Sequence, residues 1–105
     1  MNTVFKALAD PTRRKVLQLL RQGPRSAGEL AEHFAVSKPT MSAHFSVLRE
    51  ADLVDSVKQG TTVIYSLKLS VLEESLLGFA QLFGLQGGDT PSRAADPTPD
   101  EEQIR

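Results

Sequence analysis

The stretch that decides the fold is residues 37–48, which reads SKPTMSAHFSVL. Ser37 is a residue type preferred at a helix N-cap. Met41, Phe45 and Leu48 follow at i, i+4 and i+7, which predicts a helix that directs these three side chains into a core. The opposite face carries small or polar residues, namely Pro39, Thr40, Ala43 and Ser46, with Lys38, Ser42 and His44 at its edges. We expect this face to be left for a partner.

Three shorter helices are predicted before this one. Residues 3–9 form a helix that ends at Asp10-Pro11, and Asp10 then caps a second helix that stops before Gly23-Pro24. Ser26, with a glutamate three residues later, has the capping-box pattern of a third helix. A short turn separates the third helix from Ser37. The third helix, this turn and the helix that begins at Ser37 therefore have the order of a helix-turn-helix.

The pattern changes after the helix-turn-helix. Residues 53–58 and 63–67 contain β-branched residues with alternation, and the turn between them includes a glycine, so we expect a β-hairpin. Ser70 is then the expected cap of a last helix to about Gly84. The predicted fold class is therefore α+β and mainly α: a winged helix-turn-helix with about five helices and a two-stranded β-hairpin wing.

Apolar residues on the last helix form a stripe wider than one small core can cover. The stripe comprises Leu72, Leu76, Phe79 and Phe83, and Val71, Leu82 and Leu85 widen it. A chain of 105 residues also buries a modest share of its surface. Both observations favour a homodimer.

Charge and composition divide the chain near residue 86. Residues 1–85 carry a net charge of +2 and are expected to form one domain, whereas residues 86–105 carry −3, are rich in glycine, proline and acids, and are expected to form a disordered tail. The chain has no cysteine, no long apolar run and no export signal at its start, so we expect a cytoplasmic protein without membrane insertion.

The chemistry of the exposed helix face favours nucleic acid. No acid occurs between Glu32 and Glu50, and an acid-free, thin face with donors and acceptors suits base edges in a major groove. Catalysis is not expected, because the adjacent Glu73 and Glu74 point in different directions on a helix and no nucleophile or glycine loop accompanies them.

Two separated stretches resemble one known family. Residues 5–14, FKALADPTRR, are similar to the N-terminal signature of the ArsR/SmtB family of bacterial repressors, and residues 37–51, SKPTMSAHFSVLREA, are similar to its recognition helix. The resemblance runs from about residue 3 to residue 85. Within the family, the pattern resembles a small, metal-independent branch of autorepressors.

The resemblance implies a repressor that binds an inverted repeat in double-stranded DNA as a dimer built mainly from its first and last helices. The residues expected at the DNA are Ser37, Lys38, Thr40, Ser42, Ala43, His44 and Arg49, with Arg13, Arg14, Lys58, Thr61 and Thr62 as further contacts. The residues expected in the dimer interface are Val4, Phe5, Leu8, Leu72, Leu76, Phe79, Leu82 and Phe83.

The sequence departs from the family pattern at two sites. The positions of the family's metal ligands hold no cysteine, and the last helix has no histidine, so we expect neither a metal nor another cofactor. The wing glycine is followed by Thr61 and Thr62 rather than by the arginine of many members, which predicts weaker minor-groove contact.

Two alternatives stay open at this stage. One is a winged-helix protein-interaction module that has lost DNA binding, which the poor wing and the acidic tail favour. The other is a regulator that responds to a small-molecule inducer in the dimer interface, or to a protein antagonist.

Overall fold

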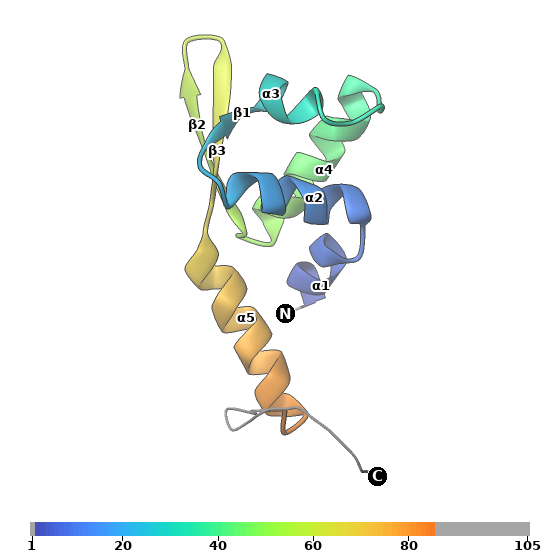
Figure 1. Cartoon of the computed structure of the whole chain (residues 1–105), viewed down its shortest axis with the longest axis vertical. Helices are drawn as coiled ribbons and strands as arrows, with labels where there is room; N and C mark the ends of the chain where they lie inside the picture. The colour runs from blue at the N-terminus through green and yellow to red at the C-terminus, as the bar shows by residue number, and fades with distance from the viewer. Residues whose placement is uncertain (1, 86–105) are drawn as a thin grey trace. The chain divides into compact units, whose positions relative to one another are not determined.

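The computed structural model describes residues 2–85. The elements of this part are, in order, α1 (Asn2–Leu8), α2 (Pro11–Leu20), β1 (Arg25–Ser26), α3 (Ala27–Ala31), α4 (Lys38–Glu50), β2 (Val54–Gln59), β3 (Thr62–Leu67) and α5 (Leu69–Leu82) (Figure 1). The chain divides into two compact units, one up to Glu73 and one from Glu74 onward, and α5 crosses the boundary. The tail expected at residues 86–105 lies outside the described residues.

Helix α1 has seven residues, too few for a helix to be stable in water by itself. Two arginines of α2 stabilise its end. Arg13 donates from Nε to the carbonyl of Ala7 at 2.9 Å and from Nη2 to that of Lys6 at 2.7 Å, and Arg14 donates from Nη1 to that of Leu8 at 2.8 Å. These carbonyls belong to the last turn of α1, where a helix leaves its acceptors unpaired.

Helix α2 begins where the sequence predicts. Oδ1 of Asp10 accepts hydrogen bonds from the backbone N–H groups of Thr12 at 2.7 Å and Arg13 at 3.3 Å. Burial raises the pKa of the Asp10 carboxyl, but these two donors, together with the charge of Arg13, lower it by more. The pKa therefore lies below its ordinary value, and the carboxylate is charged at neutral pH.

Local caps also define α3 and α4. The capping box predicted at Ser26 and Glu29 is present, with hydrogen bonds of 2.8 Å and 3.0 Å. Ser37 is the N-cap of α4. At the other end, Asp52 has a φ of +61°, and the Leu53 N–H donates to the carbonyl of Leu48 at 3.1 Å, which is the pattern of a Schellman motif. This motif turns the chain from α4 into the wing.

The sheet contains the predicted hairpin and one further strand. Strands β2 and β3 pair antiparallel, with Val54 opposite Leu67 and Gln59 opposite Thr62, so the hairpin is confirmed to within a residue. Gly60, with a φ of +63°, takes the first turn position, where a type II′ turn requires a positive φ. Strand β1 pairs with β3 on its other side and gives the order β1-β3-β2. We did not predict β1, because two residues are too few to show an alternating pattern.

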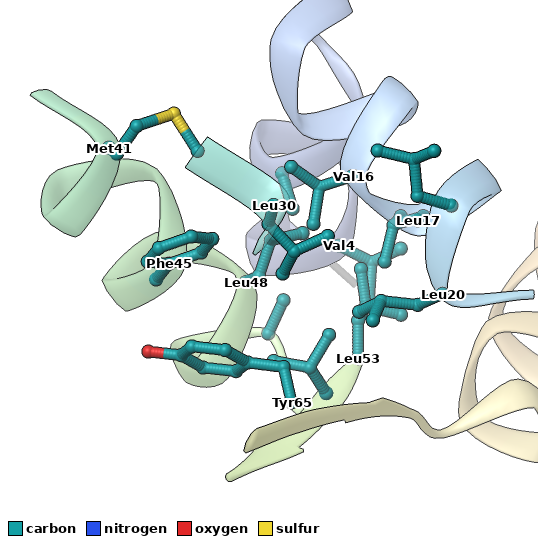
Figure 2. Packing of buried hydrophobic residues seen from close by; sticks show 14 residues of the cluster. Val4, Val16, Leu17, Leu20, Leu30, Met41, Phe45, Leu48, Leu53 and Tyr65 are labelled. Carbon is teal, nitrogen blue, oxygen red and sulfur yellow. The ribbon is translucent and has the colours of Figure 1, made fainter. Parts of the chain in front are cut away.

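The core of the first unit joins α1, α2, α3, α4 and the sheet. Figure 2 shows Leu48 of α4 packed among side chains of the other helices, and the rings of Phe45 and Tyr65 lie stacked, with centroids 4.6 Å apart. Burial raises the pKa of the Tyr65 hydroxyl. The buried residues are Val4, Ala7, Val16, Leu17, Leu19, Leu20, Leu30, Met41, Phe45, Leu48, Ala51, Leu53, Val54 and Tyr65. The predicted inward face of residues 37–48 is thus confirmed.

Helix α5 starts two residues earlier than expected, since a cap at Ser70 would make Val71 its first residue. Its first residue is Leu69, so Ser70 lies inside the first turn and the prediction that it is the N-cap is wrong. In the first unit, Val71 and Leu72 pack against the core. In the second unit, the rings of Phe79 and Phe83 meet edge to face with centroids 4.9 Å apart. None of the helices within residues 2–85 has the length and apolar character needed to cross a lipid bilayer.

The packing of α4 predicts a large effect of truncating its most buried side chain. Leu48 is 0% exposed, so Leu48→Ala should lower the free energy of unfolding by about 2–5 kcal/mol, measured by urea denaturation at a fixed protein concentration. Val57→Ala is the control, because Val57 on β2 is 56% exposed, and its effect should stay below about 1 kcal/mol. Equal losses for the two variants would contradict this assignment of the core.

Candidate nucleic-acid interface

The outer face of α4 is exposed and thin. Lys38, Thr40, Ser42 and Ala43 are all exposed, whereas Met41 between them is 2% exposed. Their side chains are short, apart from that of Lys38, so a duplex could approach the helix backbone closely. An α-helix of ordinary diameter fits the major groove of B-DNA, which is about 12 Å wide.

Two hydroxyl groups at the amino end of α4 are already paired with each other. Oγ of Ser37 accepts from the N–H of Thr40 at 3.3 Å and donates to Oγ1 of Thr40 at 2.9 Å. Since the Ser37 proton is used in this contact, the Thr40 hydroxyl keeps its own proton for an external acceptor. The pair therefore presents a fixed donor at the helix start.

Lys38 differs from the nearby arginines in having no polar partner. Within residues 2–85, no hydrogen bond or ion pair is formed by its ammonium group, whereas Arg13 and Arg14 donate to backbone carbonyls and Arg49 lies 3.5 Å from Oγ of Ser46. An unpaired cation beside an acid-free helix face is suited to a phosphate oxygen.

His44 is half-buried at the edge of this face and contacts Arg13. Nη1 of Arg13 lies 3.0 Å from Nδ1 of His44. Together with its bonds to α1, this contact directs the Arg13 guanidinium toward the protein, although the sequence suggested an outward phosphate contact. No local sequence pattern signals this pairing, because the two residues are 31 positions apart.

The wing brings one lysine to the same side of the sheet as α4. Residues opposite each other in a hairpin share a face, and so do alternate residues along a strand. Lys58 is opposite Val63 and therefore shares its face with Tyr65, whose ring stacks on Phe45 of α4. Thr61 and Thr62 are exposed at the tip. Figure 1 shows the hairpin tip and the amino end of α4 both directed toward the top of the view.

A hollow of about 270 Å³ lies between α3 and the amino half of α4. Its lining residues are Ala27, Gly28, Ala31, Lys38, Met41, Ser42 and Phe45. Because the residues from α3 are small, that helix does not cover Lys38 and Ser42. The exposed face of α4 thus stays open along its first two turns.

The residues expected in a dimer interface lie in different environments. In α1, Val4 is only 4% exposed and belongs to the core, whereas Phe5 and Leu8 are half-buried. Leu72 is half-buried beside the core. In the second unit, Leu76, Leu82 and Phe83 have exposed fractions of 45%, 71% and 61%, and Phe79 is half-buried.

Within residues 2–85, no three histidine, aspartate or glutamate side chains gather closely enough to hold an ion. The whole chain contains no cysteine.

Comparison with known proteins gives the same picture. A family model described as a helix-turn-helix domain matches residues 8–57. The transcriptional repressor SdpR of Bacillus subtilis is 47% identical over 76 residues, which are 72% of this chain and 84% of SdpR. The HTH-type transcriptional regulator Rv2034 of Mycobacterium tuberculosis is 39% identical over 97 residues, 82% of this chain and 91% of that protein.

Solved structures agree with these relatives. The crystal structure of an ArsR family transcriptional regulator matches with a TM-score of 0.68 and 32% identity, over 79% of this chain and 89% of that chain. These proteins are transcription regulators rather than enzymes, which confirms the expectation that the chain does not catalyse a reaction. The chain belongs to the ArsR/SmtB family of winged helix-turn-helix, DNA-binding transcription regulators.

Proposed function

We propose that the protein is a cytoplasmic repressor that binds an inverted-repeat operator as a homodimer and needs no metal to do so. The observation that carries the proposal is the outer face of α4, where Lys38, Ser42 and Ala43 are exposed and no acid lies between Glu32 and Glu50. Two such helices, one from each protomer, would enter successive major grooves about 34–36 Å apart. The autorepressor-like branch suggests the protein's own promoter as the first operator to test.

Phosphate contacts would come from cations around this helix. The ammonium groups of Lys38 at the start of α4 and Lys58 on the wing have no polar partner within residues 2–85, and both residues are exposed. Arg14 and Arg49 are exposed as well, and the side chain of each makes one hydrogen bond inside the protein. Of these four residues, Lys38 and Arg49 lie on α4 itself, Lys58 on the wing and Arg14 on α2.

The homodimer is supported by the apolar surface of α5. In water, exposed leucine and phenylalanine side chains gathered on one helix favour association, at roughly 25 cal/mol for each Å² of apolar surface that is buried. Leu76 and Leu82 of α5, with Phe83 directly after its last residue, supply such a surface. We infer that a second copy of the chain covers this apolar surface, because an inverted repeat has twofold symmetry and is matched by a twofold-symmetric dimer.

The alternative of a protein-interaction module receives less support, because the face that would bind DNA has kept its small side chains and its unpaired lysine. A small molecule or a protein antagonist would serve as the signal that releases the protein from DNA. The absence of cysteine makes a thiolate metal site unsuitable for that purpose.

Replacement of Lys38 tests the DNA surface. Lys38→Ala should weaken binding to the operator by about tenfold and reduce the slope of log K against log[salt] by about 1, because one phosphate contact is lost. Affinity is measured by fluorescence anisotropy over a series of salt concentrations. Arg21→Ala removes the same charge from an exposed position after α2 and should change affinity little. Equal losses in the two variants would show that net charge, rather than this contact, governs binding.

Replacement of Leu76 tests the dimer. Leu76→Glu puts a charge into the apolar surface of α5 and should convert the dimer to a monomer with much weaker operator binding, as measured by sedimentation velocity and anisotropy. Gln81→Glu adds the same charge roughly 140° around the helix and should leave the dimer intact. A dimer that persists in Leu76→Glu would exclude this face as the interface.

A further inference from the structure

The contact between Arg13 of α2 and His44 of α4 joins a basic residue to the edge of the proposed DNA surface. The two atoms involved, Nη1 of Arg13 and Nδ1 of His44, are 3.0 Å apart, which is a hydrogen-bonding distance. His44 is half-buried, and none of the groups within residues 2–85 forms a hydrogen bond with its other nitrogen, Nε2. One ring nitrogen, Nδ1, is therefore bonded inside the protein, and Nε2 has no hydrogen-bond partner within residues 2–85.

The chemistry of the two side chains decides where the imidazole proton lies. A guanidinium group only donates hydrogen bonds, so Nδ1 of His44 must accept. A neutral imidazole has one donor and one acceptor nitrogen, and with Nδ1 as acceptor the proton is on Nε2. His44 thus presents an N–H donor on the side of the ring that Arg13 does not occupy.

We propose that Arg13 is a positioning residue that fixes His44 in its Nε2–H tautomer, so that Nε2 donates a hydrogen bond to an acceptor on the DNA. The inference rests on the proposed function, in which the outer face of α4 enters the major groove. It gives Arg13 a role different from a direct phosphate contact. It also gives His44 a defined polarity, since DNA offers acceptors both on phosphates and on the major-groove edges of bases.

Three hydrogen bonds hold Arg13 in place before any DNA arrives. Besides His44, the guanidinium bonds the carbonyls of Ala7 at 2.9 Å and Lys6 at 2.7 Å. These bonds fix the guanidinium plane, and Nη1 is then directed at His44. A group that is ordered in advance loses less conformational freedom on binding, which favours affinity. The same side chain links α1, part of the proposed dimer interface, to the recognition helix.

The tautomer can be measured directly on the full chain without DNA. Long-range ¹H–¹⁵N correlation spectra at a pH about one unit above the ordinary histidine pKa of about 6.5 should show His44 with its proton on Nε2. Arg13→Met should give a mixture of the two tautomers. Arg14→Met is the matched control, because Arg14 also donates to an α1 carbonyl but makes no contact with His44, and it should keep the Nε2–H signature.

A double-mutant cycle tests the consequence for operator binding. Arg13→Met and His44→Ala should each weaken binding by about two- to tenfold, and the double variant should be no weaker than His44→Ala alone. Multiplied losses in the double variant would mean that Arg13 affects operator binding by a route other than His44, such as a DNA contact of its own or its bonds to α1, and would overturn the inference. Circular dichroism first establishes that the variants are folded.

Substitutions of His44 alone provide a second test that leaves Arg13 in place. His44→Gln carries an amide N–H₂ near the position of Nε2 and should retain affinity within about threefold, whereas His44→Asn carries its amide near Nδ1 and should bind like His44→Ala. The reverse order, or an Nδ1–H tautomer in the unsubstituted protein, would overturn the proposal. Failure of the unsubstituted protein to bind its operator would instead overturn the proposed function. The two failures can be told apart, because the spectra report the His44 tautomer in the absence of DNA.

Discussion

The structure depends on a constraint on α4, whose thirteen residues have to fill a core on one side and leave a thin surface on the other. Met41, Phe45 and Leu48 meet the first requirement and are at most 6% exposed. Their spacing places them on one side of the helix, so residues such as Ser42 and Ala43 fall on the other. Packing against the core fixes the position of the helix. The outer side chains are therefore held at fixed positions on a helix rather than on a loop.

The features that the sequence predicted correctly are those encoded within a few residues. Asp10, Ser26 and Ser37 cap helices where we expected them, because each cap bonds an N–H only two or three positions away. Strand β1 was missed because its existence depends on pairing with β3, where Arg25 lies opposite Tyr65. Serine is a residue type that favours a helix cap, yet α5 begins at Leu69, two residues before the start that a cap at Ser70 would give. The first residue of α5 directly follows Lys68, whose N–H donates to the Leu53 carbonyl at 2.8 Å.

The same distinction applies to the candidate site. Helical periodicity predicted which residues of α4 face outward, and the exposure of Lys38, Ser42 and Ala43 agrees with it. Periodicity could not separate Lys38 from Arg13, since both are basic residues near the start of an amphipathic helix. The difference arises from tertiary contacts of Arg13 with α1 and with His44, which no local pattern encodes.

The two kinds of basic side chain around this helix-turn-helix are suited to different tasks. An arginine has a planar fork of donors, and Arg13 uses it to bond two carbonyls and an imidazole at once. A lysine carries a compact charge on a flexible stem, which suits a phosphate that is approached from solvent, and Lys38 and Lys58 are both exposed. The chain has a formal net charge of −1, so its attraction for DNA has to be local. In the proposed function, Lys38 near the start of α4 and Lys58 on the wing supply this local charge, because both are exposed, whereas the guanidinium of Arg13 is held against α1 and His44.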